Sequence, residues 1–188
     1  GVNLFSGFGT AFAAMFVAWV TIILGKMALV GREEEPEKGQ LVALAGAGLV
    51  AGLATAFSTS IWFSAVEGEV YAMSTFFTTM TLWATIHWYA QPNEHQYDRW
   101  LIFALYASGM SIGVHLLSIL TFPALTFFFY LKRYQKHTFG GVVAAAAIGV
   151  AMIVAIQSLI ITGLPKLWGR LELILVNGIG LPINSGLI

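Results

Sequence analysis

Long uncharged stretches alternate with short charged ones along almost the whole chain. The first, residues 4–24, contains 21 residues, enough to cross about 30 Å of hydrocarbon as a helix. Similar stretches recur downstream, each bounded by charged or turn-forming residues: 41–57, 70–89, 100–131 and 141–164. This pattern predicts an all-α integral membrane protein built as a bundle of about six transmembrane helices.

The stretch 100–131 predicts two of those helices rather than one. Its 32 residues would extend about 48 Å as a single helix, which overshoots one crossing and falls short of two. Gly113 and Pro123 lie inside it, and both disfavour an uninterrupted helix. We therefore predict two short helices in a hairpin that reverses within 114–121, with His115 at its tip.

Polar segments separate the apolar ones. Residues 26–40 carry four glutamates, three basic residues and a proline, which is typical of a solvated loop. Residues 91–98 form a second polar break, in which Asp98 is expected to cap the helix that begins at Arg99. Residues 132–137 form a basic cluster after the predicted hairpin.

The end of the chain changes character. Residues 165–188 mix charged residues with a second apolar patch and finish in a sequence rich in Asn, Gly and Pro. Such residues favour turns and loops, so we predict an ordered external loop here rather than a seventh span. The chain is thus expected to be a single transmembrane domain over 1–188, with 165–188 as its external loop.

The composition supports the membrane assignment. Apolar residues make up 58% of the chain and charged residues only 10%, against roughly 25% charged in soluble domains. The net charge is zero and the basic residues form no single block, so nothing indicates a nucleic-acid partner. The lack of cysteine excludes thiol catalysis and disulfides. Because the sequence starts at Gly1 and enters an apolar stretch without a charged leader, we interpret it as an internal fragment of a longer protein.

The distribution of basic residues predicts an orientation. Seven of the nine Lys and Arg residues fall in the loops on one side of the predicted bundle, whereas Lys166 and Arg170 fall on the other. By the positive-inside rule the first side is cytoplasmic. The other side, which faces the periplasm or a lumen, then carries Glu67, Glu69 and His115.

The segment 58–71 holds the candidate chemistry. It places Glu67 and Glu69 between two apolar stretches, and carboxylates at bilayer depth are often retained for function because they are costly there. A solvated turn through Gly68 is an equally good interpretation. If the backbone were helical instead, Glu67 would share a face with Tyr71 and not with Glu69.

Several familiar soluble-enzyme motifs are missing: no Walker A loop, HExxH or CxxC occurs. The chemistry that suits an outer-leaflet site is transfer from a lipid-linked substrate. A carboxylate can deprotonate an acceptor hydroxyl, and a cation can hold the phosphate of a polyprenyl-phosphate leaving group.

Three segments carry a resemblance to a known family: WFSAVEGEVYAMSTFF, DRWLIFALYASGMSIGVHLLSILTFPAL and LELILVNGIGLPINSG. From about residue 41 to its end, the chain resembles a bacterial family of large multispanning proteins related to protein O-mannosyltransferases, with the GT-C glycosyltransferase architecture. The resemblance implies transfer of a sugar from a polyprenyl-phosphate donor to a protein or other acceptor, such as a glycan. It implies a bacterial inner-membrane protein with its active site facing the periplasm. Family members carry their catalytic acidic motif in a first external loop, ahead of the region represented here, so the isolated fragment is expected to be inactive.

The resemblance also implies roles for individual residues. Glu67 and Glu69 look like the acidic residues of a second external loop that faces the donor, and His115 looks like the Lys or His that relatives place near the lipid phosphate. Substrate contacts are expected from Tyr71 and, in the terminal loop, from Asn184 and Ser185. Whether a divalent metal takes part is left open by the sequence. The rival interpretation is a non-enzymatic scaffold or accessory subunit, in which the glutamates and His115 make interhelical contacts.

Overall fold

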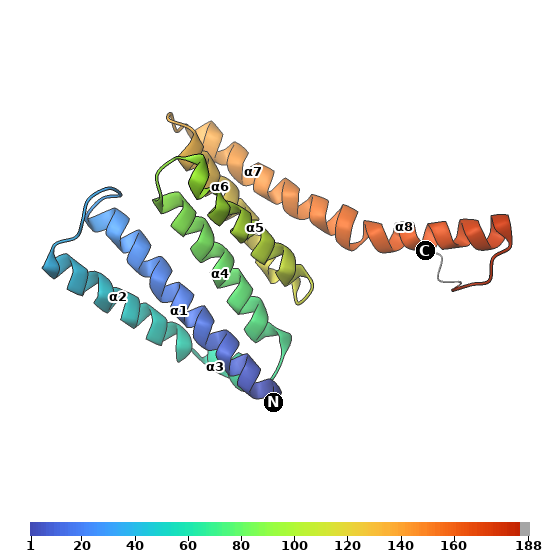
Figure 1. The fold of residues 1–188 in the computed structure, drawn as a ribbon, viewed down its shortest axis with the longest axis horizontal. Coiled ribbons are helices and arrows are strands. Elements are labelled where there is room, and N and C mark those ends of the chain that lie inside the picture. The colour runs from blue at the N-terminus through green and yellow to red at the C-terminus, as the bar shows by residue number, and fades with distance from the viewer. Residues whose placement is uncertain (185–188) are drawn as a thin grey trace.

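The structure, a computed structural model, describes residues 1–184, and these are almost entirely helical with no strand among them (Figure 1). The α-helices, in chain order, are α1 (Val2–Leu29), α2 (Lys38–Ala56), α3 (Thr59–Val66), α4 (Val70–Ala90), α5 (Asp98–Ile112), α6 (Phe122–Arg133), α7 (Phe139–Ala155) and α8 (Gly163–Ile174). Shorter helical turns join them: η1 (His95–Tyr97), η2 (Leu116–Thr121), η3 (Ile156–Ile161) and η4 (Leu175–Ile179). This confirms the predicted all-α membrane class.

Helix α1 lies between α2 and α4, α4 continues against α5, and α6 packs against α7 (Figure 1). Small residues permit the closest of these contacts. A Cβ atom at Gly48 of α2 would lie 2.6 Å from the Ile22 side chain of α1 and 3.2 Å from the Ala18 carbonyl oxygen. Because dispersion and close backbone approach drive helix association in lipid, the glycine allows α1 and α2 to pack tightly.

Four helical segments are long and apolar enough to cross a membrane: Val2–Leu29, Lys38–Ala56, Leu116–Arg133 and Phe139–Ile179. In none of them is more than a third of the most apolar window buried within the protein. Apolar side chains that face outward are expected where the surrounding solvent is lipid. Helix α4, with 21 residues, also extends roughly 30 Å. The total of six spans stays a prediction.

The predicted hairpin is confirmed. Helix α5 ends at Ile112, the chain reverses through Gly113 and Val114, and the 3-10 turn η2 leads into α6. Pro123 stands in the first turn of α6, where a helix needs no backbone N–H donor. The proline therefore begins a helix instead of breaking one, and His115 lies at the reversal.

Asp98 does not cap a helix that begins at Arg99, so that prediction is wrong. Helix α5 already includes Asp98 as its first residue, and the capping residue is Tyr97, which makes no side-chain capping bond. The Asp98 carboxylate turns instead toward the indole of Trp88 and the guanidinium of Arg133. A cation and an indole donor offer the carboxylate stronger bonds than backbone amides do.

The prediction of a loop over 165–188 is wrong for its first fifteen residues. Residues 163–179 continue the helical arm begun by α7, through α8 and η4, and Gly180 ends it with a positive φ of 76°. Pro165 occupies the first turn of α8, where its missing N–H costs nothing. The arm extends away from the other helices (Figure 1). Whether it lies outside the membrane stays a prediction.

A seam of hydroxyl side chains is buried where α4, α5 and η2 meet. Ser74 and Thr81 on α4, Ser108 and Ser111 on α5, and Ser118 in η2 are all completely or almost completely buried. Small hydroxyl residues let membrane helices approach closely. The Ser118 hydroxyl donates to the Ser108 carbonyl oxygen over 3.5 Å, whereas the hydroxyls of Ser74, Thr81 and Ser108 have no partner among the described residues. The seam packs the hairpin against α4 and so fixes the height of His115 along that helix.

Candidate functional site

The acidic segment is a tight turn between α3 and α4. Glu67 follows the last residue of α3, Glu69 precedes the first residue of α4, and Gly68 between them has a φ of 62°. A Cβ atom at Gly68 would lie 2.8 Å from the Asn3 side-chain oxygen. Glycine is therefore required both for the left-handed backbone and for the close approach of α1. The short helix α3 ahead of the turn was not predicted from the sequence.

Both carboxylates of this turn are exposed, and neither forms an ion pair within residues 1–184. The backbone is a turn through Gly68, which was one of the two interpretations, so the alternative of a helical face shared by Glu67 and Tyr71 does not apply. Glu69 is the residue at the start of the helix that carries Tyr71. Glu69 occupies the N-cap position of α4 without a side-chain capping bond.

Tyr71 and His115 come together across two elements that are distant in sequence. Their ring centroids are 5.4 Å apart, with the rings tilted by 54°. Tyr71 lies in the first turn of α4, directly after the acidic turn, and His115 lies at the tip of the hairpin. His115 therefore lies beside the first turn of the helix that follows the acidic turn.

The backbone around His115 selects one form of its imidazole. Nδ1 accepts a hydrogen bond of 3.2 Å from the backbone N–H of Leu117, so His115 caps the turn η2. An accepting Nδ1 carries no proton, and the proton of the neutral ring is then on Nε2. Nε2–H is a donor that can reach an oxygen of a bound substrate.

Asn184 lies apart from this pair. It stands on the arm, where its backbone N–H donates to a carboxylate oxygen of Glu172 over 2.8 Å, and its φ is 58°. Helix α8 packs on η3 and η4, away from α4 and the hairpin (Figure 1). Ser185 lies outside the described residues. As far as residue 184, the chain thus folds back on α8 and does not join Tyr71 and His115.

Residues 1–184 contain no group of three His, Asp or Glu side chains placed as metal ligands would be. Charged side chains do cluster at the opposite end of the bundle, which carries the loops after α1, α4 and α6 (Figure 1).

That opposite end contains a polar network that the sequence did not reveal. The Lys132 side chain is almost fully buried, donates to the Trp88 carbonyl oxygen and lies 4.3 Å from the centroid of the Trp88 ring. Arg133 donates to Asp98 over 2.5 Å and to the Asn93 side chain over 2.6 Å. Two adjacent basic residues on α6 thereby tie together the end of α4 and the start of α5.

A third cation joins the network from the loop after α1. Arg32 donates to the carbonyl oxygen of Ala90 over 3.3 Å and lies 4.5 Å from the centroid of the Tyr89 ring. The last carbonyl groups of a helix carry partial negative charge and lack partners within the helix. Lys132 and Arg32 supply those partners, so these cations stabilise the end of α4 rather than form a substrate site.

The electrostatics of Asp98 follow from this network. Burial by itself raises the pKa of the Asp98 carboxyl, but hydrogen bonds from Trp88, His95 and Arg133 outweigh burial and lower the pKa below its ordinary value. Asp98 is therefore a carboxylate at neutral pH and holds the hairpin to α4.

An apolar groove runs along the side of the bundle between α1, α4 and α5. Its volume is about 350 Å³, and its walls are mainly aromatic: Phe12, Phe16, Trp19, Phe76, Met80 and Trp83. Ring centroids of Phe16 and Trp83 lie 5.1 Å apart across the two longer helices. A groove without polar groups on the lipid-facing side of a bundle suits a hydrocarbon chain.

The fold and the site together define a helical integral membrane protein with an acidic turn, a tyrosine and a histidine gathered at one end. The chain belongs to the family of the protein O-mannosyl-transferase TMEM260 N-terminal domain, whose family model matches residues 1–138. The match includes the acidic turn, Tyr71 and His115, and it begins at residue 1, ahead of the region from about residue 41 where the resemblance was placed. No curated protein and no solved structure matches the chain.

Proposed function

We propose that this protein is part of a membrane glycosyltransferase that transfers a sugar from a polyprenyl-phosphate donor to a protein or glycan acceptor. The observation that carries the proposal is the meeting of Tyr71 with His115 beside the acidic turn, within the region matched by the O-mannosyl-transferase family. Mannose, the sugar in that family's name, is the first donor sugar to test.

In this proposal each of the site residues has a separate role in the reaction. A carboxylate of Glu67 or Glu69 takes the proton from the acceptor hydroxyl as the new glycosidic bond forms, a role that the family resemblance would give to an earlier external loop. The leaving polyprenyl phosphate keeps the electrons of the broken sugar–phosphate bond, and Nε2–H of His115 donates to one of its oxygens. Tyr71 packs against the imidazole and holds its orientation.

The donor lipid needs an apolar path to reach this end of the bundle. The aromatic groove along α1 and α4 has the chemistry of an isoprenoid-binding surface. We propose the GT-C architecture for the whole enzyme, with the acidic turn on the periplasmic or luminal side and the basic loops in the cytoplasm. The seven-to-two distribution of basic residues supports this orientation.

A transfer assay tests the proposal. The intact protein in nanodiscs receives a radiolabelled polyprenyl-phosphate mannose and candidate acceptor peptides, and acceptor labelling is measured. The Glu67→Gln, Glu69→Gln double variant is expected to lose transfer, whereas Glu34→Gln, the same change in the solvated loop after α1, retains it. Full transfer by the double variant would contradict a catalytic role for the turn.

A second candidate function is a scaffold or accessory subunit, and one observation favours it. His115 already has a structural use, because its Nδ1 caps η2. If that is its whole role, a residue that preserves the cap without an Nε2–H donor must support full activity of the complex. His115→Asn retains an acceptor near the Leu117 N–H and removes the Nε2–H, so unchanged transfer in this variant would favour the scaffold.

A further inference from the structure

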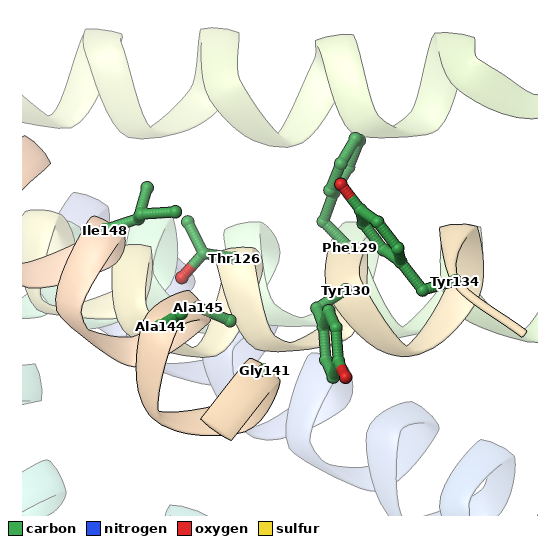
Figure 2. Close-up of a pocket in the computed structure, with 8 residues that line it drawn as sticks. All are labelled: Thr126, Phe129, Tyr130, Tyr134, Gly141, Ala144, Ala145 and Ile148. Carbon is green, nitrogen blue, oxygen red and sulfur yellow. The ribbon is translucent and has the colours of Figure 1, made fainter. Parts of the chain in front are cut away.

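A pocket opens between α6 and α7 (Figure 2). Its volume is about 370 Å³, within the roughly 300–1,000 Å³ of small-ligand sites. Tyr130 and Tyr134 stand at one end and Ile148 at the other, with alanines and Thr126 between them (Figure 2). We call this space the α6–α7 slot.

Two points of close helix approach create the slot. A Cβ atom at Gly149 would lie 2.5 Å from the Pro123 Cα atom, and a Cβ atom at Gly141 would overlap the Tyr130 ring. Between these points α7 presents Ala144 and Ala145, which are too small to fill the space opposite α6. The two helices therefore touch at both ends and leave an apolar gap between.

One end of the slot is fixed to the loop that joins α6 and α7. The Tyr130 hydroxyl donates to the Lys136 carbonyl oxygen over 3.3 Å and accepts from the Thr138 backbone N–H over 3.0 Å. Tyr134, at the start of the loop, is 58% exposed although it lines the slot. The slot thus runs from this polar loop into the apolar helix pair.

The loop and the end of α6 carry only basic charges of their own. No Asp or Glu occurs between Asp98 and Glu172 in the sequence. Of the three cations beside the slot, Lys132 and Arg133 are bound to Trp88 and Asp98, as described above. Lys136 is exposed and forms no ion pair with a carboxylate of the described residues. The backbone of Lys136 adjoins the slot, because its carbonyl oxygen accepts from the Tyr130 hydroxyl, so a residue with an unneutralised positive charge stands next to the polar end of the slot.

We propose that the α6–α7 slot binds one acyl chain of an anionic phospholipid, with the lipid phosphate at Lys136. The cavity is apolar, and a cation and two tyrosine hydroxyls stand at one end of it. It therefore complements an amphiphile that has an apolar chain and an anionic head group. Lys and Tyr are the side chains that favour the level of lipid head groups, because one part of each is apolar and the other polar. The site is separate from the proposed donor site and does not depend on sugar transfer.

Native mass spectrometry with added lipid tests this site on the purified protein. The probes are phosphatidylglycerol and phosphatidylcholine with identical acyl chains. Since one basic residue near a membrane surface favours anionic lipid about fivefold, wild-type protein is expected to retain phosphatidylglycerol about fivefold more strongly. Lys136→Gln is expected to remove that preference, and Lys166→Gln, the same change on the distant arm, to leave it intact.

A second pair of variants tests the slot itself. Ala144→Trp fills the space between α6 and α7, whereas Val143→Trp adds the same ring to the neighbouring exposed position outside the slot. We expect loss of retained phosphatidylglycerol only in Ala144→Trp. Equal retention of the two lipids by wild-type protein would overturn the proposal, as would a preference that survives Ala144→Trp. A cross-link from position 144 to a second copy, or to a helix other than α6, would also overturn it, because the slot would then be occupied by protein.

Discussion

At the scale of single residues, the two ends of the bundle use charge in different ways. At one end Glu67 and Glu69 are exposed on a turn that only glycine allows, and His115 presents one ring nitrogen while the other holds a backbone amide. At the opposite end Lys132 and Arg133 are committed to the carbonyl of Trp88 and the carboxylate of Asp98. The charged groups without partners are the candidates for chemistry, and the charged groups with partners stabilise the fold.

His115 and the glutamates are predicted to affect transfer in different ways. Glu67→Gln or Glu69→Gln, whichever removes the base, lowers kcat by about 100-fold or more, because the base acts on a proton that moves in the transition state. His115→Ala raises the donor KM by roughly tenfold or more, since a hydrogen bond to a charged phosphate contributes about 1.5–3 kcal/mol. Steady-state kinetics with each variant separate the two effects. A change in kcat alone for His115→Ala would contradict its role in donor binding.

Asp98 is predicted to stabilise the protein in a pH-dependent manner. Asp98→Asn removes charge-assisted bonds from Arg133 and is expected to lower the free energy of unfolding by about 1–2 kcal/mol at neutral pH. The folded pKa lies below the ordinary value, so this contribution is complete above about pH 5 and is lost as the pH falls through the folded pKa. Denaturant titrations at several pH values measure the difference. A gap between wild type and variant that widens at low pH would contradict this account, and Glu34→Gln serves as the exposed control.

At the scale of the elements, the apolar stretches were sufficient to predict α1, α2, α4 and α7 but not α3 or α8, and the length of residues 100–131 with its internal proline was sufficient to predict the hairpin. The terminal segment failed because Asn, Gly and Pro favour loops on average, whereas Pro165 occupies a helical first turn where it is harmless. The Asp98 cap failed for a different reason. Its true partners, Trp88 and Arg133, are 10 and 35 residues away, and local sequence cannot reveal such contacts.

The candidate site was predictable in part for the same reason. A short run of sequence identifies the acidic turn and the tip of the hairpin, because each is a break between apolar stretches. The pairing of Tyr71 with His115 depends on the buried hydroxyl seam that sets the hairpin against α4, and that is a property of packing. The form of the imidazole depends on one amide in η2.

The contact of α6 with α7 gives a prediction for this pair of helices. Gly149→Ala places a methyl group against the backbone of Pro123, which cannot move aside, and is expected to destabilise the protein by about 1–3 kcal/mol. Gly140→Ala, in the same helix but with nothing within 4 Å, is expected to be neutral or slightly stabilising. Denaturant titration compares the two. Equal stabilities would show that α6 and α7 are not in close contact at Gly149.

At the scale of the whole molecule, the basic residues of the bundle concentrate at one of its two ends. The loops after α1, α4 and α6 meet at the basic end, and the acidic turn and the hairpin tip meet at the other (Figure 1). We predict that the basic end is cytoplasmic. The natural chain has no cysteine, so a single cysteine at position 35 is expected to resist a membrane-impermeant thiol reagent in cells, and one at position 67 to react with it. Labelling at position 35 alone would reverse the orientation.

The central claim is that a polyprenyl-phosphate sugar binds at the end of the bundle where Tyr71 meets His115. Site-specific photo-crosslinking tests it most directly, with a photoreactive residue in place of Tyr71 or of Tyr97 at the basic end, and a radiolabelled polyprenyl-phosphate mannose in nanodiscs. We predict donor-dependent labelling from position 71 that an excess of unlabelled donor abolishes, and none from position 97. Labelling from position 97 but not from position 71 would contradict the account.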